Sequence, residues 1–210
     1  MTNKPVIIIG NGGHARVLNE ILFTKDIKVL GYTAPEEGIN YYNLPYLGDD
    51  STICTYSQDS VLLVNGIGSV SDTSLRAKLF NEFKSQGYFF LSLIHSSAII
   101  SSLAELGEGV QILAGVVIQP FAKIDDNTII NTSSVIEHDC TVGKHCHIAP
   151  GSVLSGNAYI AQGSHIGTGS IIIQNIKIGN NSLVGAGSLV IKDVLDNKVV
   201  YGIPAKEVKK

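Results

Sequence analysis

The sequence places one histidine between two carboxylates, Glu137-His138-Asp139, two residues after Ile136. An imidazole has an unperturbed pKa of about 6.5, so at neutral pH it is available to accept a proton. A neighbouring carboxylate can hold the ring in one tautomer and stabilise the imidazolium that forms. These residues could therefore act as a general base that activates a nucleophile. The alternative interpretation is an exposed histidine that takes part in no chemistry.

Further histidines follow at regular distances. His147 comes nine residues after His138, in a run that also contains His145, and His165 comes eighteen residues after His147. Several imidazoles close together could instead ligate zinc, which binds histidine nitrogens in tetrahedral sites. Which chemistry is available depends on the elements that carry these side chains.

An aliphatic residue recurs at every sixth position from Ile94 onward, without a slip or an insertion. A fixed period marks a repeat architecture, and a helix of 3.6 residues per turn cannot keep a period of six on one face. The aliphatic positions are Ile94, Ile100, Leu106, Ile112, Ile118, Ile124, Ile130, Ile136, Val142, Ile148, Leu154, Ile160, Ile166, Ile172, Ile178, Val184 and Val190.

This repeat predicts a triangular coil in which each six-residue unit supplies one short strand and one corner, and three units complete a turn. The aliphatic side chains stack inside, and the residue four places later, which is usually small, fits beneath a corner. Cys140 and Cys146 occupy that small slot, so we interpret them as core residues rather than reactive thiols. His138 falls on a corner or an outward position. Gly156 follows His138 by one full turn and should lie directly above it.

The chain before about residue 92 alternates strands with helices. Apolar runs predict strands at Val6–Ile9, Lys28–Tyr32, Val61–Val64 and Tyr88–Leu91. Helical spacing covers Ala15–Phe23 and a second stretch from Ser71 or Asp72 to the stop at Gly87. The alternation predicts a small Rossmann-like parallel α/β domain of four or five strands. The predicted domains are therefore residues 1–92 and residues 93–210.

A glycine pattern lies between the first strand and the first helix. Gly10, Gly12 and Ala15 fit Gly-x-Gly-x-x-Ala, in which glycines let a phosphate approach the backbone at a helix N-terminus. The acidic residue of a nicotinamide-dinucleotide site is missing at Tyr32-Thr33, and the domain is too short for a complete dinucleotide fold. A second candidate phosphate or sugar loop, Gly66-Ile67-Gly68, follows the third strand, although an ordinary turn fits it as well.

Composition and charge exclude several classes of function. The net charge is −3 and the pI about 6.0, so the basic footprint that nucleic acid or anionic lipid requires is missing. Three cysteines are too few for a disulfide framework and indicate a reducing compartment. The first apolar run is too short for a signal peptide, and no stretch approaches the roughly 20 apolar residues of a membrane span. We expect a cytoplasmic protein.

The hexad pattern resembles the hexapeptide-repeat acyltransferases, whose coils form a left-handed parallel β-helix. Three segments narrow the resemblance to the sugar O-acyltransferase family, which contains sialic-acid O-acetyltransferases and N-acetyltransferases of nucleotide-linked amino sugars. They are Gly-Asn-Gly-Gly-His at residues 10–14, Asn-Thr-Ser-Ser-Val-Ile-Glu-His-Asp-Cys at residues 131–140, and Tyr-Gly-Ile-Pro-Ala-Lys at residues 201–206. The resemblance spans the whole chain. It implies a homotrimer with acetyl-CoA lying between neighbouring β-helices at the subunit interfaces.

The resemblance also implies roles for single residues. His138 matches the base, and Asp139 is favoured over Glu137 as its partner because the family has an acidic residue after the histidine. His147 and Asn131 match positions near the acetyl group or the sugar, and His147 is expected to stabilise the thioester carbonyl as negative charge develops on its oxygen. The Gly156 N–H matches the donor to the thioester carbonyl, where removing such a donor typically costs about 10²–10³ in rate. A glycine that only forms a corner fits Gly156 equally well.

The ligand sites follow from the same resemblance. A UDP- or dTDP-sugar is expected on the first domain, although many relatives carry aspartates where Tyr32 and Thr33 stand here. CoA is expected along the later coils and the Gly202–Lys206 segment. The residues expected to bind the nucleotide sugar are Gly10, Gly12, Gly13, His14, Thr33 and Gly66. Those expected to contact CoA are His165, Gly167, Gly185, Pro204 and Lys206.

These observations predict an acetyl-CoA-dependent N-acetyltransferase of a nucleotide-linked 4-amino-deoxy sugar for a bacterial surface glycan. The sequence leaves open O-acetylation of sialic acid or a related sugar, because one histidine base can serve an amine or a hydroxyl. A non-catalytic scaffold that binds a sugar nucleotide is a third possibility. A zinc hydratase like the β-helical carbonic anhydrases is disfavoured, because their pair of histidines five residues apart is missing: Gly143 follows His138 and Pro150 follows His145 at that spacing. We expect no metal.

Overall fold

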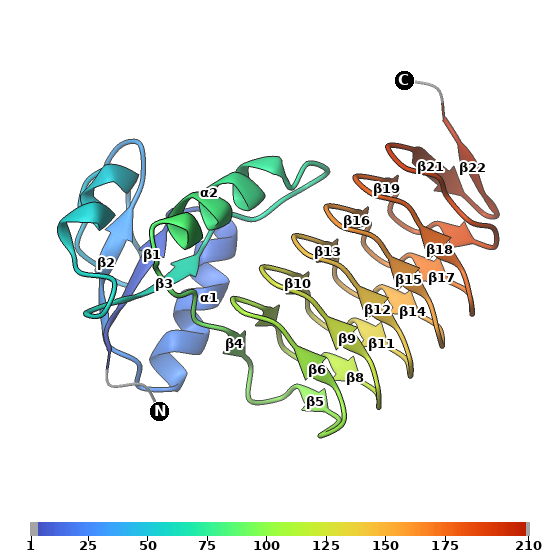
Figure 1. The fold of residues 1–210 in the computed structure, drawn as a ribbon, viewed down its shortest axis with the longest axis horizontal. Helices are drawn as coiled ribbons and strands as arrows, with labels where there is room; N and C mark the ends of the chain where they lie inside the picture. Colours follow the sequence, from blue (N-terminus) through green and yellow to red (C-terminus); the bar gives the residue numbers. More distant parts are fainter. Residues whose placement is uncertain (1–3, 209–210) are drawn as a thin grey trace. The chain divides into compact units, whose positions relative to one another are not determined.

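The computed structural model describes residues 4–208, which form two compact units (Figure 1). The first unit contains the residues up to Gly68 together with Leu75–Leu93. The second contains the residues from Ile94 onward together with the short segment Ser69–Ser74. Nothing in the sequence signalled that this segment belongs with the repeats. The assignment of sugar-nucleotide binding to one domain and acetyl transfer to the other stays a prediction.

The first unit is built on a small parallel sheet with the order β2-β1-β3. All four residues of β1 are buried, as expected for the central strand of a parallel sheet whose faces are both covered. Within the residues described, no helix is long and apolar enough to cross a bilayer. The elements are β1 (Val6–Ile9), α1 (Gly13–Thr24), β2 (Val29–Thr33), the 3₁₀ helix η1 (Asp50–Thr55), β3 (Leu62–Asn65) and α2 (Ser74–Ser85).

The prediction of four or five strands was wrong, because the sheet has three. Single bridges, Tyr32 to Tyr46 and Leu63 to Phe90, extend its two edges by one residue each. The expected strand at Tyr88–Leu91 pairs with β3 only through Phe90. At its first residue the Tyr88 N–H donates to Phe83 O at the end of α2, at 3.1 Å, and is therefore not available to β3.

The second unit is the parallel β-helix that the sequence predicts (Figure 1). Its strands are two residues long, and the second residue of each is the aliphatic of the six-residue repeat. They are β4 (Leu93–Ile94), β5 (Ile99–Ile100), β6 (Glu105–Leu106), β7 (Gln111–Ile112), β8 (Val117–Ile118), β9 (Lys123–Ile124), β10 (Ile129–Ile130), β11 (Val135–Ile136), β12 (Thr141–Val142), β13 (His147–Ile148), β14 (Val153–Leu154), β15 (Tyr159–Ile160), β16 (His165–Ile166), β17 (Ile171–Ile172), β18 (Lys177–Ile178), β19 (Leu183–Val184) and β20 (Leu189–Val190).

The strands stack into three sheets, each named here by one of its strands. The β11 sheet has the order β20-β17-β14-β11-β8-β5, and the β12 sheet has the order β18-β15-β12-β9-β6. The β13 sheet has the order β22-β21-β19-β16-β13-β10-β7-β4 and ends in an antiparallel pair, β21 (Val199–Gly202) and β22 (Ala205–Glu207). In the regular coils paired residues lie eighteen positions apart, as in Val135 with Val153, and the separation falls to sixteen where β19 pairs with β21.

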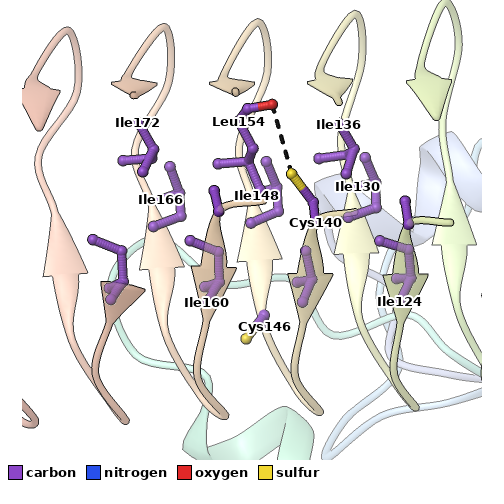
Figure 2. Packing of buried hydrophobic residues seen from close by; sticks show 14 of the residues in the cluster. Ile124, Ile130, Ile136, Cys140, Cys146, Ile148, Leu154, Ile160, Ile166 and Ile172 are labelled. Carbon is purple, nitrogen blue, oxygen red and sulfur yellow. Dashed lines mark hydrogen bonds between the residues drawn. The ribbon is translucent and has the colours of Figure 1, made fainter. Parts of the chain in front are cut away.

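The interior of the coil holds the aliphatic columns, which point inward from all three sheets (Figure 2). The small residues beneath the corners donate hydrogen bonds to carbonyls of the next coil. Ser134 Oγ donates to Ala149 O at 2.9 Å, and Cys146 Sγ donates to Ala161 O at 3.1 Å. Burial raises the pKa of Cys140 to about 11 and that of Cys146 to about 12. Both thiols therefore stay protonated and belong to the core.

Candidate active site

His138 and Asp139 lie together on the corner, residues 137–140, that joins the β11 sheet to the β12 sheet. The Nδ1 atom of His138 is 2.7 Å from Oδ2 of Asp139, and each side chain is 54% exposed. Asp139 takes a left-handed backbone conformation, φ 61°, which aspartate tolerates better than most residues. A carboxylate only accepts, so Nδ1 donates to it, and in the neutral ring the lone pair is then on Nε2. The side chain can therefore take a proton through Nε2.

Gly156 lies against the His138 ring, one coil further on. A Cβ atom at Gly156 would stand 2.7 Å from both Cε1 and Nε2 of His138, so only glycine leaves room for the ring in this position. The Asn157 N–H donates to the His138 carbonyl at 2.9 Å and fixes the two corners together. Among residues 4–208, no protein acceptor takes the Gly156 N–H. A hydrogen-bond donor without a protein partner thus lies beside the candidate base.

His147 and Asn131 form a second cluster, at the corner between the β13 and β11 sheets. Asn131 Nδ2 is 3.0 Å from Nε2 of His147, and His147 as a whole is only 6% exposed. Nδ1 of His147 meets Ser69, 2.8 Å from its Oγ and 3.1 Å from its carbonyl oxygen. The His165 ring stacks edge-to-face on His147, with centroids 4.8 Å apart. Ser69 was missed by the sequence analysis, because it lies 78 positions from His147 outside the repeat.

The two clusters lie on different corners of the coil. His138 follows β11, whereas Asn131 precedes it, so the width of the β11 sheet separates them. One chain therefore brings His138 together with Asp139 and Gly156, and brings His147 together with Asn131, but it does not join these two groups through any contact described.

The residues expected to contact CoA mostly gather at the C-terminal end of the coil. Gly167 and Gly185 lie one coil apart, and the Tyr201 ring occupies the space beside Gly185 that any side chain there would need. Lys206 pairs with Tyr201 across β21 and β22, and Pro204 lies in the turn between these strands after a cis peptide bond. His165 is different, because it is buried and burial lowers its pKa to about 4.

The glycines of the first unit surround the N-terminus of α1. Gly12 caps the helix without a side-chain hydrogen bond, the first turn has no acidic residue, and no atom lies within 4 Å of a Cβ built at Gly12 or Gly13. Such an open helix N-terminus suits a phosphate. Gly10 has a φ of 96°, which favours glycine. His14 lies next in the same first turn, with its Cβ 3.0 Å from where a Cβ of Gly68 would stand.

Two other positions expected to bind the nucleotide sugar serve the packing of the first unit. Gly66 sits so close to Ile9 O, 2.7 Å from a built Cβ, that only glycine fits there. Thr33 is fully buried, and its hydroxyl donates to Asp50 Oδ1 at 2.6 Å. A carboxylate thus stands at the end of β2, supplied by η1 rather than by the strand itself. The spacing of seventeen residues between Thr33 and Asp50 gave no signal for this pairing.

Within residues 4–208, no group of three or more His, Cys, Asp and Glu side chains is arranged to hold a metal ion. His145, the other histidine of the central run, is buried with its Nδ1 2.9 Å from Asn127 Nδ2.

Comparisons with known proteins find family models and solved structures that are similar to both units of this chain. Residues 5–83 match the family model of the PglD N-terminal domain, and residues 121–156 match that of the bacterial transferase hexapeptide with six repeats. A search of curated proteins gives no match. Among solved structures, a variant of GDP-perosamine N-acetyltransferase from Caulobacter crescentus, with one histidine replaced by alanine, was crystallised with CoA and GDP-perosamine. It is 33% identical, with 100% of this chain and 99% of that chain covered and a TM-score of 0.92. The acetyltransferase domain of PglB from Neisseria gonorrhoeae, in complex with acetyl coenzyme A, is 28% identical, with 99% and 100% covered and a TM-score of 0.91.

Proposed function

This chain belongs to the hexapeptide-repeat sugar acyltransferase family and is an acetyl-CoA-dependent sugar acetyltransferase, and we propose that it N-acetylates a nucleotide-linked 4-amino-deoxy sugar destined for a bacterial surface glycan. The observation that carries the proposal is the His138 ring, held by Asp139 at 2.7 Å and lying against Gly156. The similarity to an N-acetyltransferase of GDP-perosamine favours an amine over a hydroxyl acceptor.

The proposed reaction uses His138 as the base and the Gly156 N–H as a hydrogen-bond donor. The sugar amine attacks the thioester carbon of acetyl-CoA, and Nε2 of His138 takes the proton that the nitrogen loses. Asp139 stabilises the imidazolium through Nδ1. The Gly156 N–H donates to the oxygen on which negative charge develops. The carbon–sulfur bond then breaks, the amide forms, and the proton leaves with the CoA thiol.

An acceptor panel tests this function. The protein is incubated with acetyl-CoA and with amino and hydroxy sugars linked to UDP, dTDP or GDP, and the release of the CoA thiol is measured. The sequence predicts UDP or dTDP, and GDP is included because the Caulobacter crescentus enzyme was crystallised with GDP-perosamine. Turnover with an amino sugar supports the proposal. Turnover only with hydroxy sugars means O-acetylation, and binding without thiol release means a scaffold.

An uncovered aliphatic column supports the proposed homotrimer. The outward residues of the β11 sheet are all aliphatic along its six strands: Ile99, Val117, Val135, Val153, Ile171 and Leu189. The corresponding column on the β12 sheet is mostly polar: Glu105, Lys123, Thr141, Tyr159 and Lys177. Continuous apolar patches are uncommon on monomers and mark interaction surfaces. We propose that two further copies cover the β11 sheet, around a threefold axis parallel to the coil.

Such an arrangement completes the active site. In a closed ring, the His138 edge of one β11 sheet meets the Asn131 edge of the next. A coil rises about 4.8 Å in eighteen residues. His138 follows Asn131 by seven residues and precedes His147 by nine, so it lies about 2 Å above the first and about 2 Å below the second along the coil axis. Rotation alone thus brings His138 of one copy level with the Asn131–His147 pair of its neighbour.

Mixed oligomers test this arrangement. His138→Ala and Asn131→Ala chains are each expected to be nearly inactive, whereas co-expression should restore about one quarter of the sites through native edges from two different copies. No recovery would mean that each site lies within one chain. For the interface itself, Ile171→Lys should yield monomers in light scattering, whereas Tyr159→Lys, at a position of similar exposure on the β12 sheet (45% against 43%), should leave the oligomer intact.

A further inference from the structure

Ser69 holds one side of the His147 ring, and Asn131 holds the other. The Ser69 hydroxyl and carbonyl oxygens lie 2.8 and 3.1 Å from Nδ1, and Asn131 Nδ2 lies 3.0 Å from Nε2. The ring is nearly fully buried. Both ring nitrogens therefore have protein hydrogen-bond partners. The position of the ring proton follows from which of these partners donates and which accepts.

The two sides require the same tautomer. A carbonyl oxygen can only accept a hydrogen bond, so Nδ1 carries the proton. On the other side, the Asn131 amide has a defined orientation, because its Oδ1 accepts from the Thr132 N–H at 2.8 Å. Its Nδ2 must then face His147 as a donor, so Nε2 carries a lone pair. His147 is neutral, with its proton on Nδ1.

His165 completes the cluster without adding a charge. Its ring packs edge-to-face on His147 at an angle of 78°, and its burial favours the neutral form. Its Nδ1 lies 3.5 Å from the Ser69 hydroxyl. When the Ser69 oxygen accepts from His147, its own proton can point toward His165. The polar groups then form one chain from His165 through Ser69 and His147 to Asn131.

We propose that Ser69 is a positioning residue, which fixes His147 as a hydrogen-bond acceptor so that the amide of Asn131, and not the imidazole, donates to the substrate. This inference rests on the proposed function. An Nε2 lone pair cannot donate to a developing oxyanion, so the oxyanion role expected for His147 does not suit this tautomer. An amide nitrogen carries two hydrogens, and His147 uses one of them. The second is the donor offered to the sugar or to the thioester oxygen.

Nitrogen NMR of the histidine rings tests the tautomer directly, in the native chain and without substrate. We expect a protonated Nδ1 and an unprotonated Nε2 for His147 at neutral pH. A proton on Nε2, or on both nitrogens, would overturn the proposal. This readout is independent of the acceptor panel: if no sugar is acetylated, the proposed function fails while the tautomer result stands.

Two variants test the positioning role. Ser69→Ala removes the shorter contact to Nδ1 and leaves the backbone carbonyl, so we expect the tautomer to be kept, the Nδ1 signal of His147 to shift, and kcat/KM to fall about 3- to 10-fold, the usual effect of one neutral hydrogen bond. Thr73→Val is the matched control. Thr73 lies in the same segment and donates to Gly163 O at 3.0 Å, so its loss should leave the His147 signals and kcat/KM unchanged. Native NMR signals and kinetics in Ser69→Ala would contradict the proposal.

Asn131→Asp separates the two possible donors. A carboxylate at residue 131 cannot donate, and it favours a proton on Nε2 of His147. If Asn131 is the donor, kcat/KM falls at least 10²-fold, as for other lost transition-state donors. If His147 donates through Nε2, the carboxylate would support it and activity would stay within a few-fold of native, which would refute the assignment. Thermal melts of all variants check that the fold is retained.

Discussion

Gly156→Ala is the sharpest single test of the His138 assignment. The Gly156 backbone lies outside the left-handed region, so alanine can adopt its conformation. The three atoms nearest to the new Cβ all belong to the His138 ring, at 2.7, 2.7 and 3.4 Å. Carbon atoms in ordinary contact stand about 3.5–4.0 Å apart, so the ring must move by about 1 Å. Because the side chain is half exposed, it can swing outward without disturbing the coil.

The expected result is an enzyme that folds normally and turns over slowly. A displacement of about 1 Å in a catalytic group can cost about 10²-fold in rate, which corresponds to about 2.7 kcal/mol in the barrier. Unfolding free energy should change by less than about 0.5 kcal/mol, as for a surface substitution. Thiol release under saturating substrates gives kcat, and a thermal melt gives the stability.

A double variant supplies the control. In a His138→Ala background no ring remains to be displaced, so adding Gly156→Ala should cost nothing further. Native turnover in the single variant would refute the placement of the base beside Gly156. An equal loss in both backgrounds would mean that the new methyl group acts on the thioester or its donor and not on His138.

Three further predictions follow from contacts and burial. Asp139→Asn should lower kcat by about 10²-fold or more, because an amide does not stabilise the imidazolium as a carboxylate does and can donate to Nδ1, which favours the other His138 tautomer, whereas Glu137→Gln should stay within about twofold of native. Burial lowers the pKa of His165 to about 4 in the folded chain, against about 6.5 unfolded, so its contribution to stability is complete above pH 6.5 and declines toward pH 4. Between pH 7 and pH 5 the unfolding free energy should fall by about 2 kcal/mol through this group, and His165→Gln should lose less stability over the same range in denaturant melts. A thiol reagent at pH 8 should add once, at the exposed Cys54, and a second adduct by mass spectrometry on the folded protein would contradict the burial of the other two cysteines.

The repeat could be predicted from sequence because each of its positions has one environment. An aliphatic at every sixth residue predicted every strand from β4 to β20, since the second residue of each strand packs in or against the core of the coil. The small slot after it also followed, and the hydrogen bonds of Ser134 and Cys146 explain why small donors suit it. The first unit was less regular. Tyr88–Leu91 has the composition of a strand, but the Tyr88 N–H donates to Phe83 O at the end of α2 instead of to β3, and local composition does not encode such a contact.

In the candidate site, too, contacts within the repeat could be predicted from sequence and contacts from outside it could not. His138 and Gly156 could be paired from sequence because they are one coil apart, and the same is true of His147 and His165. Contacts from outside the repeat gave no signal: Ser69 reaches His147 across 78 positions. In the first unit, Asp50 likewise reaches Thr33 from η1 instead of from the strand where an acidic residue was looked for.

The coil also gives a physical reason why the proposed active site would need more than one copy of the chain. A period of eighteen stacks equivalent residues directly above one another, so residues that meet across neighbouring coils differ by about eighteen, as Asn131 and His147 do at sixteen. Asn131 and His138 differ by seven, which places them on the two edges of one sheet whatever their side chains do. Local rearrangement cannot join them, because moving either residue to the other edge would break the six-residue register of the aliphatic core. If both contribute to one reaction, the contact must come from a neighbouring copy, and the aliphatic column between them is the surface that we propose for its packing.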